Sequence, residues 1–193
     1  GQATLSLDLA GEPLHRRGWR TTTTVAPLKE TLAAAVLLLG RVDPDQPFVD
    51  PLCGSGTLAI EQALRARRIA PGLDRAFAFQ RWPCYRSELQ SRWDKLRAQA
   101  RAEVLPSAPA PILAMDLHPK AIDACYRNAH LAGVANDVVI ERGDCRDLTP
   151  RFGPGVLCMN PPYGERLMDE EGAEHDRAAA RTKERKLEGF YRG

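Results

Sequence analysis

The chain has 193 residues, of which 44% are hydrophobic and 27% charged, a composition that excludes a disordered protein and suits one domain with a sizeable core. Its formal net charge of +2 is too small to indicate a nucleic-acid partner by itself. No apolar run approaches the roughly 18 residues of a membrane span, and the N-terminus lacks the pattern of a secretion signal, so we expect a cytoplasmic protein.

The first part of the chain predicts a connecting segment, residues 1–26, before the main domain, residues 27–193. Residues 4–9 alternate apolar and polar side chains, which is typical of a half-buried strand. Residues 27–39 predict a buried apolar helix that begins with Pro27 in its first turn and ends at Gly40.

Four short apolar segments then predict strands at residues 48–50, 112–116, 138–141 and 156–159. Helical patterns at 57–70 and 119–132 lie between the first three. This alternation predicts an α/β fold with a parallel sheet. Because ligands of such sheets bind outside the carboxyl ends of the strands, we expect the chemistry there.

An insertion at residues 65–108 interrupts this alternation. Between residues 65 and 101 it holds ten Lys or Arg against three acids, interleaved with aromatic residues at 77, 79, 82, 85 and 93. Cations and aromatic faces together suit RNA. A helical insertion with its own aromatic core and a solvated basic face is an equally good interpretation.

The tail, residues 165–193, is highly charged and predicts no further strand. An open sheet of four strands that ended here would leave a core strand at its edge, which proteins normally avoid. We therefore expect that the sheet is incomplete in this chain and that the chain is a piece of a longer protein.

A glycine-containing turn follows the first predicted core strand and leads into a helix. It comprises Asp50, Pro51, Leu52, Cys53, Gly54, Ser55, Gly56 and Thr57. Glycines suit a sharp turn where the backbone approaches a ligand. The spacing Gly54-x-Gly56-x-x-Ala59 also fits a nicotinamide enzyme loosely, whereas no Gly-Lys-Ser/Thr is present for a triphosphate.

This turn resembles the first motif of class I (Rossmann-like) methyltransferases, which bind S-adenosylmethionine. That cofactor carries no phosphate, so its site needs glycine backbone near the amino-acid moiety and an acid near the sulfonium, a role that Asp50 suits. The alternative is that Asp50 only caps the turn.

Acids also follow the second and third predicted strands. Asp116, followed by Leu117, lies where a carboxylate can accept hydrogen bonds from both ribose hydroxyls, although it could also act as a helix N-cap. Asp144, followed by Cys145, lies where class I methyltransferases place an acid against the adenine amino group. We expect Asp147 to act as a cap or to face solvent.

The sequence Asn160-Pro161-Pro162-Tyr163 follows the fourth predicted strand and is the most specific motif in the chain. An exocyclic base amine is a poor nucleophile, so an enzyme must hold its hydrogens with acceptors and aim its nitrogen. The Asn160 side chain and the Pro161 carbonyl can accept these hydrogens, two prolines stiffen the backbone, and Tyr163 can stack on the base. The alternative is an ordinary Asn-Pro-Pro turn.

Taken in order, these motifs resemble the THUMP-domain-containing (UPF0020-type) RNA N2-guanine methyltransferases, especially the L/K type that acts on large-subunit ribosomal RNA. The similarity is carried by residues 6–11, 14–20, 27–33, 50–57, 69–72 and 160–167. The resemblance implies S-adenosylmethionine as cofactor and a guanine N2 in 23S ribosomal RNA as target, in protein-poor or precursor form. It also implies that residues 15–20 belong to the connection toward an upstream RNA-binding module.

Three other functions stay open from the motifs alone. The same tetrapeptide serves enzymes that methylate adenine N6 in DNA or RNA. The chain could also be a fragment that binds cofactor or RNA without turnover, and a nicotinamide oxidoreductase is a more distant alternative. We expect no metal in a methyltransferase of this kind, since the five cysteines contain no Cys-x-x-Cys pair.

Overall fold

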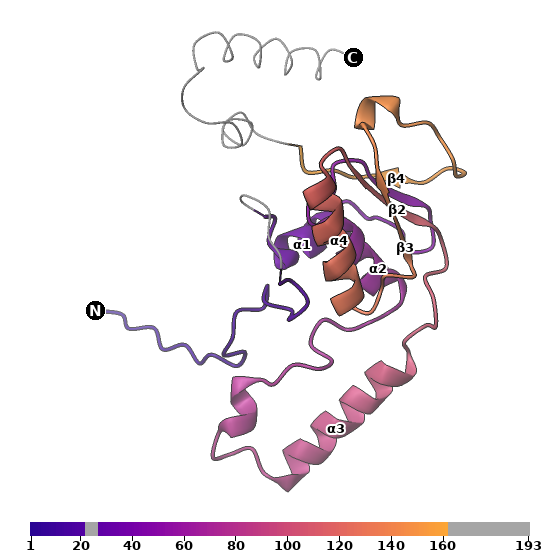
Figure 1. The fold of residues 1–193 in the computed structure, drawn as a ribbon. Coiled ribbons are helices and arrows are strands. Elements are labelled where there is room, and N and C mark those ends of the chain that lie inside the picture. Colours follow the sequence, from indigo (N-terminus) through magenta and orange to yellow (C-terminus); the bar gives the residue numbers. More distant parts are fainter. Residues whose placement is uncertain (22–26, 162–193) are drawn as a thin grey trace. The chain divides into compact units, whose positions relative to one another are not determined.

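The computed structural model describes residues 1–21 and 27–161. Four parallel strands form one sheet in the order β3-β2-β1-β4, and Figure 1 labels β2, β3 and β4 in the part of the molecule that also holds α1, α2 and α4. The strands are β1 (Phe48–Asp50), β2 (Ile112–Asp116), β3 (Val138–Arg142) and β4 (Val156–Leu157). The predicted α/β class is confirmed, and all four predicted strands are present.

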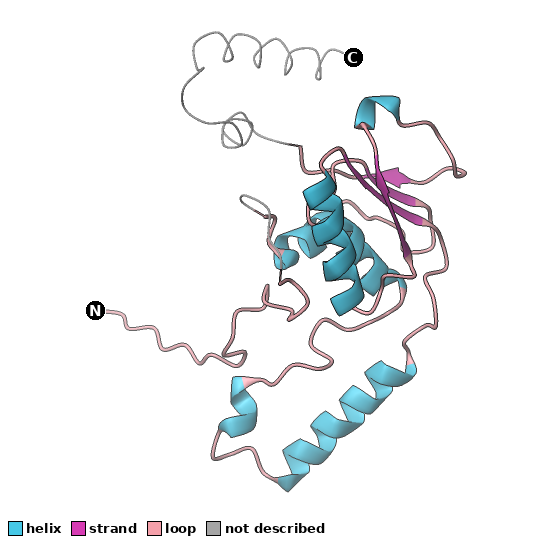
Figure 2. Cartoon of the chain, in the orientation of Figure 1, coloured by secondary structure: helices cyan, strands magenta, loops and turns pink. Residues whose placement is uncertain are grey.

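Helices connect the strands and pack on the sheet. They are α1 (Glu30–Leu39), α2 (Thr57–Ala66), α3 (Ser87–Ala102) and α4 (Pro119–Leu131), with short 3-10 helices at Ala78–Arg81 (η1) and Cys145–Asp147 (η2). Figure 2 shows α1, α2 and α4 on one side of the strands, whereas α3 lies away from them. The helix expected over 57–70 ends earlier, because Arg68 takes a left-handed conformation with φ of 57°.

The core lies between the sheet and the helices α1, α2 and α4. Phe48, Ile112 and Val138 occupy one row across the three longer strands and are at most 5% exposed. The same core includes Ile60 of α2 and Cys125 of α4. Burial of this row fixes the register of the sheet and therefore the level at which each strand ends.

Residues 4–9 do not form the expected strand, so that prediction is wrong. Among the described residues no strand pairs with this segment, and Leu5 and Leu7 are 91% and 72% exposed. Two backbone hydrogen bonds near its end, from Ala78 and Phe79 to the carbonyls of Ala10 and Leu9, hold it against the insertion. Alternation alone did not identify a strand, because a strand also needs a neighbour.

The helix expected over 27–39 begins later and is less buried than predicted. Its N-cap is Lys29, in an extended conformation, and the preceding Leu28 carbonyl accepts a hydrogen bond from the Arg20 side chain instead of joining the helix. Only one face of α1 packs on the core. Leu32, Leu38 and Leu39 are 52%, 60% and 85% exposed, so an apolar composition overstated the burial of this helix.

Candidate cofactor site

Three acids lie at the carboxyl ends of neighbouring strands. Asp50 ends β1, Asp116 ends β2 and Asp144 follows the end of β3. Because β1, β2 and β3 are parallel neighbours, these ends lie along one edge of the sheet. The structure thus brings together the three acids that the sequence patterns indicated separately.

The glycine turn between β1 and α2 is fastened to the end of β2. The Cys53 amide donates to the Met115 carbonyl at 2.8 Å, and the Gly54 amide donates to the Asp116 carboxylate at 2.9 Å. Asp116 also accepts a hydrogen bond from the His118 amide at 2.9 Å. One carboxylate therefore orients both the glycine turn and the entry to α4, and it keeps acceptor capacity for a ligand.

Both glycines of the turn have backbone conformations that other residues rarely adopt. Gly54 has φ of 54° and Gly56 has φ of 89°. A Cβ atom on Gly56 would lie 2.4 Å from the Cys125 sulfur. The turn consequently packs against α4 at a distance that only glycine permits.

Asp50 is a buried carboxyl group with few partners. It is 1% exposed and accepts a hydrogen bond from the Leu52 amide at 3.3 Å. Burial raises its pKa to about 8, and the neighbouring Asp116 acts in the same direction. A carboxyl group that is largely neutral near pH 7 becomes charged more readily when a cation binds beside it.

Asp144 has the opposite character. It caps η2 by accepting a hydrogen bond from the Arg146 amide at 2.9 Å, and it forms an ion pair with the Arg146 side chain at 2.5 Å. These hydrogen bonds lower the pKa of Asp144 to about 2. Asp144 is thus the cap of η2. Asp147, for which a capping or a solvent-facing position was expected, is exposed.

The thiol of Cys53 is part of the wall of the turn. A hydrogen bond with Cys125 and burial both raise the pKa of Cys53 well above its ordinary value, so it behaves as a neutral packing group. Leu117, which follows Asp116, is exposed, and Cys145, which follows Asp144, is partly exposed.

Two residues that bond to the glycine turn, Arg20 and Asn128, were not predicted from the sequence to take part in the site. The Arg20 side chain donates to the Thr57 hydroxyl, and the Asn128 side chain donates to the Ser55 carbonyl. Asn128 lies in the buried stripe of α4, among residues 121, 124, 125 and 129. A polar residue at a core position of an otherwise apolar stripe is a signal that could have identified it.

The proposed catalytic tetrapeptide is described only in part. β4 ends at Leu157, and Asn160 follows it closely in the chain. Asn160 and Pro161 belong to a second compact unit that begins at Asn160. Pro162 and Tyr163 lie outside the described residues, as does the charged tail, so their predicted roles remain predictions.

The insertion contains its own aromatic cluster, formed by Phe77, Phe79, Tyr85 and Trp93. Phe79 lies at the centre, with its ring centroid 5.6 Å from that of Phe77, 5.6 Å from Tyr85 and 5.3 Å from Trp93. These faces pack against each other, which favours the interpretation of a helical insertion with a small aromatic core over that of open stacking platforms.

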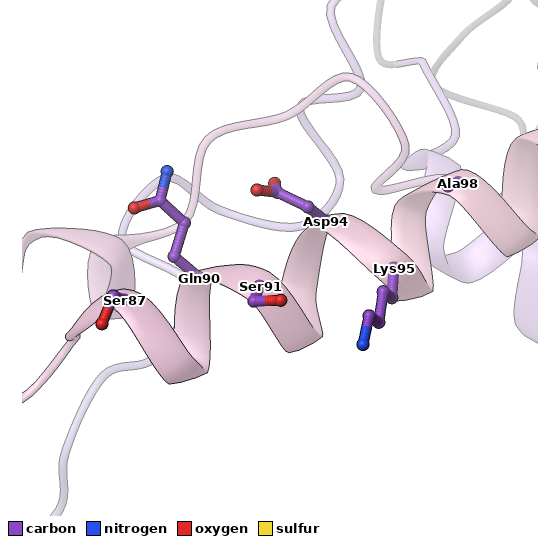
Figure 3. Close-up of a pocket in the computed structure, with 6 residues that line it drawn as sticks. All are labelled: Ser87, Gln90, Ser91, Asp94, Lys95 and Ala98. Atoms are coloured by element: carbon purple, nitrogen blue, oxygen red, sulfur yellow. The ribbon is translucent and has the colours of Figure 1, made fainter.

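Several cations of the insertion are also committed to partners within the chain. Arg67 pairs with Asp137, Arg92 with Glu88 and Arg101 with Asp74. A hollow along α3, shown in Figure 3, is lined by residues 87, 90, 91, 94, 95 and 98 of this one helix. Its side chains come from a single face and carry both charges, so they do not form a convergent site.

The described residues contain no group of three or more His, Cys, Asp or Glu side chains that could hold a metal ion. Within the same ranges, no helix has both the length and the apolar character needed to cross a membrane.

Comparison with known proteins identifies similar sequences and folds. Residues 17–182 match the family model UPF0020, described as RMKL-like, methyltransferase domain. The chain is 46% identical over 178 residues to the ribosomal RNA large subunit methyltransferase K/L of Methylococcus capsulatus, covering 88% of this chain and 24% of that protein.

Two solved structures resemble the chain closely. The crystal structure of SMU.472 complexed with SAH is 39% identical, with a TM-score of 0.74 over 84% of this chain and 42% of that one. A predicted N6-adenine-specific DNA methylase from Listeria monocytogenes is 34% identical, with a TM-score of 0.75 over 96% of this chain and 46% of that one. The chain spans less than half the length of these relatives.

Proposed function

The chain belongs to the RMKL-like methyltransferase domain family (UPF0020), and we propose that it transfers a methyl group from S-adenosylmethionine to the exocyclic N2 amino group of a guanine in 23S ribosomal RNA. The observation that carries the proposal is the glycine turn held to the carboxyl end of β2 by Asp116, beside the buried Asp50. The partner would be ribosomal RNA in protein-poor or precursor form.

The residues at the strand ends fit this cofactor chemically. The sulfonium is a cation, and Asp50 is a buried carboxyl group whose ionised form a cation would stabilise. Asp116 would accept the ribose hydroxyls, and Asp144 would accept the adenine amino group. Pro51, Cys53, Gly54, Ser55, Gly56, Thr57, Leu117 and Cys145 would form the remaining cofactor contacts. The SAH bound to SMU.472 supports this choice of cofactor.

When bound, the cofactor would supply a methyl group. Its carbon–sulfur bond would break as the base nitrogen formed the new bond, and the electron pair of the broken bond would pass to sulfur. Asn160 and the Pro161 carbonyl would accept hydrogen bonds from the amino hydrogens, and the nitrogen finally loses one proton to solvent. Pro162 would stiffen this segment and Tyr163 would stack on the base. Positioning of the two reactants would provide most of the acceleration.

A second candidate is methylation of adenine N6, because the tetrapeptide suits either base amine. The name of the Listeria monocytogenes structure, an N6-adenine-specific DNA methylase, favours it, whereas the name of the Methylococcus capsulatus protein favours ribosomal RNA. Incubation with labelled cofactor and protein-free 23S ribosomal RNA, followed by nucleoside analysis, separates them. We expect N2-methylguanosine; N6-methyladenosine alone would overturn the guanine assignment.

Calorimetric titration tests the division of roles between cofactor and catalytic residues. We expect Asp116→Ala to weaken S-adenosylmethionine binding about tenfold or more, because a charged acceptor is lost. Asn160→Ala should bind the cofactor within about twofold of the wild type yet abolish methyl transfer. Asp45→Ala removes an exposed acid near the amino end of β1 and serves as the control.

Each failure in this titration has a distinct meaning. If neither Asp116→Ala nor Asn160→Ala changes binding or transfer, the assigned site is wrong. If the wild-type chain binds the cofactor but labels no RNA, it is a binding fragment. Tight binding of a nicotinamide cofactor in place of S-adenosylmethionine would support the oxidoreductase alternative.

A further inference from the structure

The segment around residues 13–21 docks on α1 and α2 through two buried ion pairs. Arg17 pairs with Glu61 at 2.8 Å, with 10% and 4% of the two side chains exposed. Arg20 pairs with Glu30 at 3.1 Å, with 10% and 5% exposed. Trp19, which lies between the two arginines, is 5% exposed and belongs to the main core. This segment is therefore an integral part of the folded unit.

The two ion pairs are similarly buried, but their arginines differ in the further hydrogen bonds that they donate. The guanidinium of Arg17 donates two hydrogen bonds, of 2.8 and 3.1 Å, to the carboxylate of Glu61, which lies in α2. The guanidinium of Arg20 donates to the Thr57 hydroxyl and to the Leu28 carbonyl, both at 2.7 Å. Because Thr57 is the first residue of α2 and the last of the glycine turn, only Arg20 is tied to the turn.

A second tie reaches the same turn from α4. Asn128 is fully buried, and its side-chain amide donates to the Ser55 carbonyl at 3.0 Å. Its side-chain oxygen accepts a hydrogen bond from the Thr21 amide at 3.4 Å. The consecutive residues Arg20 and Thr21 are thus connected to the two neighbours of Gly56. Arg20 bonds directly to Thr57, and Thr21 is linked to Ser55 through Asn128.

The location of Arg20 is electrostatically unfavourable without its partner. A cation near the first turn of a helix opposes the helix dipole, and burial lowers the pKa of Arg20 while Glu30 acts in the opposite direction. Glu30 offsets both effects by pairing with the guanidinium. Simple anchoring of the segment would not need a cation at this point, since Arg17 and Trp19 already provide it.

We propose that Arg20 and Asn128 are positioning residues of the cofactor site, which hold the glycine turn from behind and make cofactor affinity depend on the N-terminal segment. The inference rests on the proposed function, in which the turn binds S-adenosylmethionine. Neither side chain needs to touch the cofactor; each fixes a polar group of the turn, Thr57 or Ser55.

The test compares Arg20→Ala with Arg17→Ala, which removes the similarly buried ion pair to Glu61, one helical turn along α2 from Thr57. Calorimetric titration with S-adenosylmethionine should show about tenfold weaker binding for Arg20→Ala, since a charged hydrogen bond to the turn is lost. Arg17→Ala should bind the cofactor within about twofold of the wild type, even if its melting temperature falls as much as that of Arg20→Ala. Equal affinities for the two variants would overturn the inference.

A second pair of variants tests the same contact from the other side. Thr57→Val removes the hydroxyl that Arg20 donates to, while Thr57→Ser retains it, so the glycine turn should loosen in the valine variant and not in the serine variant. Amide hydrogen exchange in the turn at residues 53–57 should accelerate in Arg20→Ala and Thr57→Val, without a similar change in Arg17→Ala. Unchanged exchange in the first two would count against positioning.

Failure of the proposed function has a different signature. If the wild-type chain does not bind S-adenosylmethionine, the cofactor assignment fails, whereas the exchange measurement still reports whether Arg20 orders the turn. If the wild-type chain binds and Arg20→Ala binds as tightly as Arg17→Ala, the cofactor assignment stands and the positioning role is rejected.

Discussion

Gly56 lies at the start of α2, where two separate restrictions act on one residue. Its φ of 89° is strained for any residue with a Cβ atom, and that atom would lie 2.4 Å from the sulfur of Cys125. Gly133, at the end of α4, shares the first restriction with φ of 72°, but a Cβ atom there would meet no other atom within 4 Å. The two glycines therefore separate backbone strain from close packing.

We expect Gly56→Ala to destabilise the protein by about 2–5 kcal/mol, which combines left-handed strain with overpacking against α4. Gly133→Ala should lower stability by about 1–2 kcal/mol, from backbone strain alone. Urea unfolding of both variants measures the difference. Equal losses would show that α4 moves aside and that the close approach at Gly56 is not a constraint.

Among the elements, the insertion that contains η1 and α3 differs most from the rest of the fold. No side chain of α3 is buried, and the aromatic cluster around Phe79 provides its packing. Hydrogen bonds from Arg97 to the Leu73 carbonyl and from Arg101 to Asp74 fasten α3 to the preceding loop. This part of the insertion thus has a small aromatic core of its own.

Phe79→Ala should loosen this insertion by about 2 kcal/mol, because three ring contacts are lost at once. Hydrogen exchange of the α3 amides should accelerate, while S-adenosylmethionine affinity should stay unchanged, since the cluster is separate from the glycine turn. Trp82→Ala is the aromatic control, because Trp82 lies outside the cluster. A loss of cofactor affinity in Phe79→Ala would show that the insertion supports the cofactor site.

For the molecule as a whole, the buried carboxyl group of Asp50 makes stability depend on pH. Its pKa of about 8 in the folded protein exceeds its ordinary value of 3.8, so the folded state binds more protons between these values. The contribution of Asp50 to the free energy of unfolding is therefore greatest below about pH 4, and it declines as pH rises toward 8. A bound cation would oppose that decline by favouring the ionised form.

Asp50→Asn should flatten the stability profile between about pH 5 and 8, measured by urea unfolding, because the amide does not titrate. Asp144→Asn is the contrasting control. The pKa of Asp144 is lowered from 3.8 to about 2, so its contribution is present above its ordinary pKa and is lost only as pH falls through the lowered value. A profile for Asp50→Asn as steep as that of the wild type would contradict the assignment.

Local patterns along the chain were enough to predict the order of the core elements and the candidate acids. The strands predicted at 48–50 and 112–116 agree with the structure residue for residue, because buried parallel strands are short apolar runs with a polar residue at the end. The glycine turn was identifiable for a similar reason, since positive φ angles select glycine locally.

Which residues act together became evident only from the packing of the elements in space. Residues 4–9 alternate as a strand does but have no pairing partner among the described residues, and strand formation requires one. The contacts of Arg20 with Thr57 and of Asn128 with Ser55 join residues 37 and 73 positions apart. Hydrogen bonds at such separations depend on how α2 and α4 pack, which local patterns in a sequence do not encode.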